Sequence, residues 1–179
     1  GSVVSQIGFV GCGFGVGLVP SRSMRFGSSA VAFRPLVEMI DVFPTLLDLA
    51  GLEATHAHYG CSFVQCLRDT GAPHREKVFS EGGFLVKEAD HFENAGFPYD
   101  IKGTQQREHP ESVGKVAVVR TLEWTYVWRL YEGPELYRRT TDPNETTNLA
   151  GMPEYAEIEA DLLASLLRWQ VETADVLPA

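Results

Sequence analysis

The spacing of apolar residues predicts a long amphipathic helix near the C-terminal end of the chain. Pro153 suits the first turn of a helix, where its missing N–H group would have no partner. Apolar residues then recur every three or four positions, which is the period of one helix face: Tyr155, Ile158, Leu162, Leu166 and Trp169. Leu163 and Leu167 widen this face. We expect the helix to pack on the strands that precede it.

Two β-strands are predicted within residues 116–131. This stretch contains two runs rich in Val, Trp and Tyr, with residues 122–124 near the bend, and such residues favour strands. Trp124, Tyr126 and Trp128 alternate, so they should share one face of the sheet. That face is suited to stacking on a sugar ring, but cover by the C-terminal helix is the expected role. Residues 142–145, Asp-Pro-Asn-Glu, have the composition of a turn.

Shorter elements are predicted between residues 36 and 82. Residues 36–40 are an apolar run suited to a strand. Residues 41–50 predict a helix, because an aspartate stands at the N-cap position, a proline lies in the first turn and Gly51 follows as a stop. Residues 62–68 favour a short helix, and residues 77–81 favour a strand that ends in two glycines.

Two segments have no clear periodicity. Residues 84–114 mix aromatic, charged and proline residues, which predicts a long irregular loop that is either functional or disordered. Residues 1–33 are rich in glycine, but the spacing does not fit a G-x-G-x-x-G fingerprint and no Gly-Lys-Ser/Thr follows. We therefore expect a poorly ordered segment there and not a nucleotide site.

Composition restricts the class of protein further. Hydrophobic residues make up 44% and charged residues 22% of the chain, as in ordinary globular proteins. The net charge of −9 disfavours nucleic acid as a partner. No run reaches the roughly 18 apolar residues that a membrane span needs, so no membrane association is expected.

The cysteine and histidine residues do not form a metal-binding pattern. Cys61 and Cys66 are close enough in sequence for a disulfide, but we expect free, buried thiols. His56 and His58 would share a side of an extended segment as a weak metal pair, but a third ligand is missing. No metal site is therefore expected in this chain.

Four segments, in order, resemble the C-terminal part of a formylglycine-dependent sulfatase of the alkaline-phosphatase-like superfamily. Residues 37–51 resemble the family's Asp-Pro-Thr helix. Residues 59–67 resemble its Gly-Arg-Ser-Leu segment, with Cys61 where arginine is usual. Residues 78–81 resemble the strand that enters the C-terminal subdomain, and residues 135–150 resemble the closing Glu-Leu-Tyr, Asp-Pro and Asn-Leu-Ala signature.

This resemblance implies an α+β fold, in which a small antiparallel sheet is packed by a C-terminal helix. A remnant of the sulfatase α/β core would lie on the N-terminal side. The chain would then consist of the atypical glycine-rich segment (residues 1–33), the core remnant with its strand, Asp-Pro-Thr helix and linker (residues 34–76), and the C-terminal subdomain (residues 77–179).

The same resemblance implies a parent enzyme that hydrolyses sulfate esters, with calcium and formylglycine as its cofactors and a sulfated small molecule or glycan as its substrate. This chain lacks the residues for that chemistry. Leu18 stands at the nucleophile's place before Pro20-Ser21-Arg22, and residues 1–33 contain neither Lys nor His. We therefore expect no catalytic residue and no cofactor in this chain, and no activity from it alone.

Three residues are candidates for substrate binding. Glu81 ends a predicted strand beside two glycines, which would allow a ligand to approach closely. His91 and Lys102 lie in the irregular segment and have the chemistry to bind a sulfate or a sugar hydroxyl. A solvated position is the more common role for a residue such as Glu81 at a strand end and for a single histidine such as His91 on a loop. Arg120 is expected to pair with Glu135 or Glu123.

An alternative function is a non-catalytic carbohydrate- or protein-binding module. It would use the irregular segment 84–114 and the aromatic strand.

Overall fold

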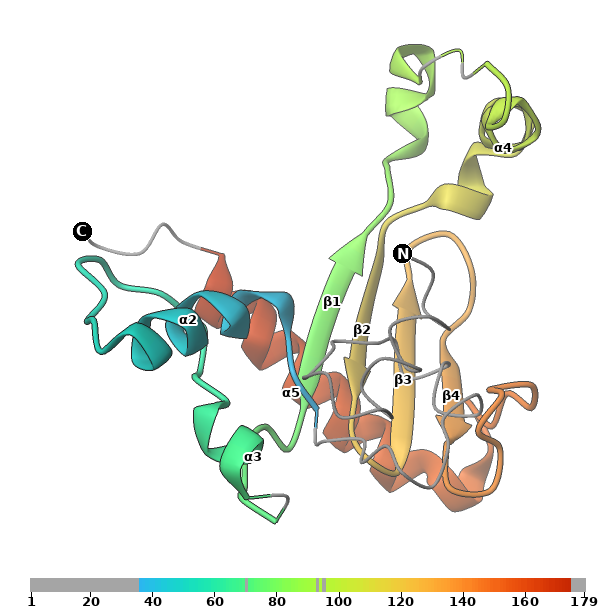
Figure 1. Cartoon of the computed structure of the whole chain (residues 1–179). Coiled ribbons are helices and arrows are strands. Elements are labelled where there is room, and N and C mark those ends of the chain that lie inside the picture. The colour runs from blue at the N-terminus through green and yellow to red at the C-terminus, as the bar shows by residue number, and fades with distance from the viewer. Residues whose placement is uncertain (1–35, 70, 93, 95, 175–179) are drawn as a thin grey trace. The chain divides into compact units, whose positions relative to one another are not determined.

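The computed structural model describes residues 36–174 except 70, 93 and 95. The chain divides into two compact units, Gly1–Arg75 (unit 1) and Glu76–Ala179 (unit 2), and each is described here by itself (Figure 1). The glycine-rich segment of residues 1–33 lies outside the described residues.

The described part of unit 1 contains the helices α2 (Val42–Ala50) and α3 (Val64–Arg68), both as predicted. Helix α2 ends at Gly51, which has a φ of 68°, a left-handed conformation that glycine adopts without strain. The predicted strand of residues 36–40 is wrong. Leu36 forms only an isolated bridge with Arg75, and Met39–Asp41 form a 3₁₀ turn, η2.

Unit 2 is built on a four-stranded antiparallel sheet in the order β1-β2-β3-β4 (Figure 1). The strands are β1 (Val78–Gly82), β2 (Val116–Arg120), β3 (Trp124–Arg129) and β4 (Glu135–Arg138). The first three confirm the predicted strands. The fourth is a short addition whose residues had been noted only for the sulfatase-like signature.

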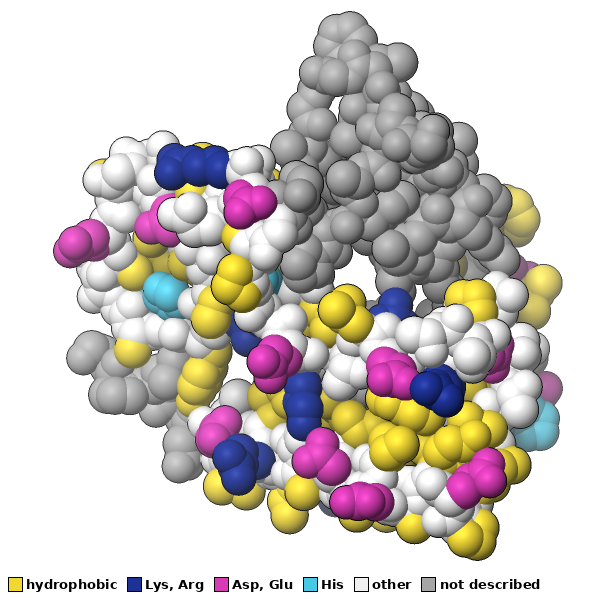
Figure 2. Space-filling model, turned by 90° about the horizontal axis from the view of Figure 1, so that it is seen from below, with side chains coloured by type: hydrophobic (Ala, Val, Ile, Leu, Met, Phe, Trp, Pro, Cys, Tyr) yellow, Lys and Arg dark blue, Asp and Glu magenta, His cyan; other side chains and the backbone are white. Residues whose placement is uncertain are grey.

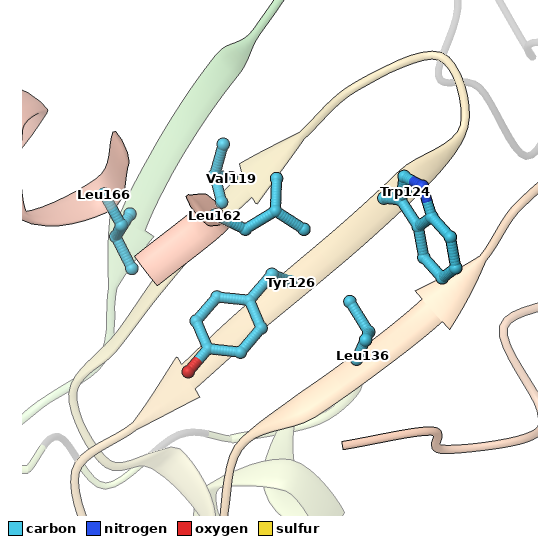
Figure 3. Packing of buried hydrophobic residues seen from close by; sticks show 6 residues of the cluster. All are labelled: Val119, Trp124, Tyr126, Leu136, Leu162 and Leu166. Carbon is cyan, nitrogen blue, oxygen red and sulfur yellow. The ribbon is translucent and has the colours of Figure 1, made fainter. Parts of the chain in front are cut away.

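Helix α5 (Ala156–Thr173), preceded by the 3₁₀ turn η5 (Pro153–Tyr155), confirms the predicted C-terminal helix. It packs on the sheet through one buried cluster (Figure 3): Val119, Trp124, Tyr126, Leu136, Leu162 and Leu166. The sheet and its covering helix give the α+β fold that the sequence predicted. None of the described helices is long and apolar enough to cross a membrane.

The segment between β1 and β2 contains more structure than its sequence suggests. It forms η3 (Val86–His91), α4 (Asp100–Glu108) and η4 (Pro110–Val113), so the prediction of a wholly irregular loop is wrong. Helix α4 contains almost no apolar residues; its sequence is Asp-Ile-Lys-Gly-Thr-Gln-Gln-Arg-Glu. The sequence therefore shows no periodic apolar face from which a helix could be predicted. The two ends of the segment are joined, because Phe84 N–H donates to the Val113 carbonyl at 2.9 Å.

Candidate functional site

Among the described residues of unit 1, the carboxylate of Asp41, at the start of α2, has several hydrogen-bonding partners. Its side chain is fully buried and accepts hydrogen bonds from the N–H groups of Glu38 and Cys61, each at 2.8 Å. Arg75 Nε donates to it at 2.8 Å, and His74 Nε2 lies 3.3 Å away. Asp41 stands at the N-cap position as predicted, but its side chain makes no capping bond to α2. Its hydrogen bonds therefore connect three segments that are separate in the sequence, at Glu38, Cys61 and Arg75.

The surroundings of Asp41 keep it ionised. Burial of the carboxylate raises its pKa, but the hydrogen bonds from Arg75 and from the two backbone N–H groups, together with the charge of Arg75, outweigh this effect and lower the pKa to about 2. The hydrogen bond to Asp41 likewise raises the pKa of Arg75. Because protein donors occupy both carboxylate oxygens, this cluster is a fixed ion pair and not a reacting group.

Acid is expected to remove the stabilising effect of Asp41. Its folded-state pKa of about 2 lies below the ordinary 3.8, so the unfolded state binds more protons between these values. The stabilisation is complete above the ordinary pKa and is lost as the pH falls through 3.8 toward 2. Thermal unfolding of native chain and the Asp41→Asn variant, followed by circular dichroism, should show a melting-temperature difference that shrinks toward pH 2. A difference that stays constant with pH would contradict this role of Asp41.

The closing signature is held together by a second ion pair, in unit 2. Arg120 of β2 donates to Glu145 at 2.8 Å, and the Thr125 hydroxyl donates to the same carboxylate at 2.8 Å. The expected pairing of Arg120 with Glu135 or Glu123 is wrong, because Arg129 and Arg138 bind those two residues. Glu145 lies 25 residues from Arg120, which explains why local sequence did not indicate the pair.

The turn that carries Glu145 is organised by Asp142. The Asp142 carboxylate accepts hydrogen bonds from the N–H groups of Thr146 and Thr147, both at 2.8 Å. The bond from Thr147, followed by the bonds from Thr146, lowers the pKa of Asp142. Within this turn Glu145 adopts a φ of 55°. The signature residues in this turn therefore have a structural role.

The predicted substrate-binding residues lie in different places within unit 2. Glu81 of β1 is exposed, and its carboxylate accepts a hydrogen bond from Gln170 of α5 at 3.0 Å. His91 is exposed at the end of η3. Lys102 lies on α4, but its side chain is outside the part that the structure describes. No described contact joins Glu81 to His91, so the three residues remain separate predictions.

The two histidines considered as a weak metal pair pack on an aromatic ring. The rings of His56 and His58 have centroids 5.2 and 5.7 Å from that of Phe43. Among residues 36–174, apart from the three gaps, no group of three or more His, Cys, Asp or Glu side chains is placed to hold a metal ion.

The two described cysteines are free, as expected, but only Cys66 is buried and Cys61 is exposed.

The aromatic residues of β3 separate into two groups. Trp124 and Tyr126 belong to the buried cluster beneath α5, as predicted for a covered sheet face. Burial, followed by the nearby charge of Glu159, raises the pKa of Tyr126 to about 12. Trp128, two residues further along the same face, is 44% exposed.

Comparisons with known proteins show which proteins this chain is similar to. No family model matches. The chain is 27% identical over 144 residues to the multifunctional alkaline phosphatase superfamily protein PehA of Trinickia caryophylli, and the match covers 77% of this chain and 25% of that protein.

Solved structures give the same result. A 2-O GAG sulfatase matches with a TM-score of 0.54 and 27% identity, over 75% of this chain and 25% of its own. The phosphonate monoester hydrolase of Silicibacter pomeroyi matches with a TM-score of 0.54 and 29% identity, over 76% of this chain and 25% of its own.

In sequence and fold, the chain is similar to the C-terminal part of sulfatases and phosphonate monoester hydrolases of the alkaline-phosphatase-like superfamily. It spans about a quarter of the length of the relatives that it matches.

Proposed function

We propose that this chain is the C-terminal portion of a hydrolase that cleaves sulfate esters, and that this portion alone does not catalyse the reaction. The observation that carries the proposal is the match to a quarter of a 2-O GAG sulfatase. The calcium and formylglycine chemistry of such an enzyme would be supplied by the parent's other three quarters. Glu81, His91 and Lys102 are proposed to contact the sulfated substrate from this side.

The exposed face of α2 and its flanks supports the idea of a larger parent. Large apolar side chains on this stretch are 41–78% exposed: Met39, Ile40, Phe43, Leu46, Leu49 and Leu52. A helix with so much exposed apolar surface normally packs against another element. We propose that this face packs on the part of the parent enzyme that lies outside the match. Charged side chains of both signs are interspersed with apolar ones on the face of the molecule shown in Figure 2.

An assay of the chain by itself tests the proposal. The chain is incubated with an aryl sulfate in the presence of calcium, and release of the phenol is followed by absorbance. The expected rate equals that of the heat-denatured chain. Turnover above that background would overturn the proposal that the chemistry lies elsewhere.

A second candidate reaction is hydrolysis of phosphonate monoesters. It is favoured by the 29% identity to the Silicibacter pomeroyi enzyme, which is as high as the identity to the sulfatase. An aryl phosphonate monoester tested beside the aryl sulfate, with a parent polypeptide that includes the upstream region, separates the two reactions. Faster turnover of the phosphonate would favour this second candidate.

A further inference from the structure

The exposed apolar face of α2 forms a wide strip. Phe43, Leu46 and Leu49 are 41–59% exposed and follow one another at intervals of three residues, and each such step turns an α-helix about 60° backward. The three side chains therefore span about 120° of the helix surface. Pro44 and Thr45, on another side of the helix, are buried. Helix α2 thus has one side inside unit 1 and a second, apolar side that requires a cover.

The exposed charges of this stretch are acidic. Residues 39–53 contain no Lys, Arg or His. Asp41 is buried in its ion pair, whereas Asp48 and Glu53 are exposed. A second copy of the chain on this face would bring a second set of these carboxylates to the interface, and like charges placed together disfavour association. An occupant without charge meets no such repulsion.

An apolar segment without charge precedes α2 in the sequence. Its residues 10–18 alternate between glycine and an apolar residue: Val10, Cys12, Phe14, Val16 and Leu18. Successive side chains of an extended chain point to opposite sides, so an extended segment 10–18 has one apolar side and one glycine side. The first charged side chain of the sequence is that of Arg22. The segment lies outside the described residues, and by itself its glycine content favours poor order, so it needs another apolar surface to pack on.

The lengths of the two stretches correspond. Nine extended residues cover about 30 Å at roughly 3.3 Å per residue, and the stretch from Met39 to Leu52 covers about 20 Å at roughly 1.5 Å per residue. Residues 19–38 connect them, and these twenty residues can extend up to about 66 Å. The connection is therefore long enough for the segment to run along α2 in either direction.

We propose that residues 10–18 pack in an extended conformation on the exposed apolar face of α2. The apolar side of the segment contacts Phe43, Leu46 and Leu49, and the removal of these side chains from water stabilises the contact. The glycine side faces away and leaves backbone N–H and C=O groups accessible to water. This inference goes beyond the proposed function, because the occupant is a segment of this chain. One extended segment covers only part of the strip, and the remainder stays available to other parts of the parent enzyme.

Cys12 lies on the apolar side of the segment and provides the measurement. The whole native chain is treated briefly with a thiol reagent, and peptide mass spectrometry gives the labelling rate of each cysteine relative to its rate in urea. Cys61 is exposed and Cys66 is buried, so they are the fast and slow references. Cys12 should react at least about tenfold more slowly than Cys61, because the segment must open before the thiol is accessible. A Cys12 rate equal to that of Cys61 would overturn the proposal.

A pair of leucine substitutions tests whether α2 is the surface that protects Cys12. Leu46→Ser removes an apolar contact and should raise the Cys12 rate by about tenfold, while a slow Cys66 shows that unit 1 remains folded. Leu167→Ser is the matched control, because Leu167 of α5 is 64% exposed and Leu46 is 59% exposed. The control should leave Cys12 protected. Equal Cys12 rates in the two variants would contradict packing on α2.

A photoreactive side chain identifies the occupant even if Leu46→Ser disturbs folding. Leu49→p-benzoylphenylalanine in the whole chain should cross-link on irradiation to a peptide from residues 10–18 of the same chain, and the same replacement of Leu167 should not. A covalent dimer, which would identify a second copy as the occupant, or the absence of any cross-link to residues 10–18 would overturn the proposal. None of these measurements involves catalysis, so the failure of a parent polypeptide to hydrolyse sulfate esters would disprove the proposed function alone.

Discussion

Replacing Asp41 with alanine is expected to lower the free energy of unfolding of unit 1 by about 3–5 kcal/mol, the range observed when one partner of a buried ion pair is removed. Arg75 would lose its principal counter-charge, and the N–H groups of Glu38 and Cys61 would lose their acceptor. Domains are commonly stable by only about 5–15 kcal/mol. The loss is therefore a large fraction of the stability expected of a small unit such as this one.

Hydrogen exchange measured by mass spectrometry is the suitable measurement for the Asp41 variant, because it reports on each peptide separately. Peptides from α2 and α3 should lose most of their protection, and peptides from the sheet of unit 2 should keep theirs. Asp48→Ala removes an exposed carboxylate from the same helix and should change little. Equal protection of α2 in the two variants would show that the buried pair does not stabilise unit 1.

Elements with a strong apolar period were predictable from the sequence. Helix α5 was visible because Leu162 and Leu166, which are buried, repeat at helical spacing, and β2 and β3 were visible from their β-branched and aromatic residues. The apolar run of residues 36–40 was misleading. Its Met39 and Ile40 are 78% and 50% exposed, and the adjoining Asp41 draws the chain into a turn by bonding to Glu38 N–H.

The polar networks could not be predicted, because their partners are distant in sequence. Asp41 binds Cys61 and Arg75, which are 20 and 34 residues away, and Arg120 binds Glu145 across 25 residues. Local patterns carry no information about such pairs. The relevant signal was the closing signature, which correctly indicated the fold even though the role of Glu145 within it was not recognised. The alternation of aromatic residues in β3 predicted a shared face, but only the structure shows that Trp128 is 44% exposed on that face.

Leu166→Ala is expected to destabilise unit 2 by about 2–5 kcal/mol, because it removes a buried side chain and leaves a cavity that closes only partly. Leu166 is 4% exposed and belongs to the cluster that joins α5 to the sheet. The adjacent Leu167 is 64% exposed. Leu167→Ala makes the same chemical change in the same helix, so it corrects for helix propensity and should alter stability by no more than about 0.5 kcal/mol.

Urea denaturation followed by tryptophan fluorescence measures this difference, because Trp124, Trp128 and Trp169 all lie in unit 2. The midpoint should move to lower urea for Leu166→Ala and stay near the native value for Leu167→Ala, with similar slopes. A lower urea midpoint for Leu167→Ala than for Leu166→Ala would mean that the exposed face of α5, and not the face that packs on the sheet, stabilises the unit. A shift confined to Leu166→Ala would show that the packing of α5 on the sheet, through the buried cluster that contains Leu166, stabilises unit 2.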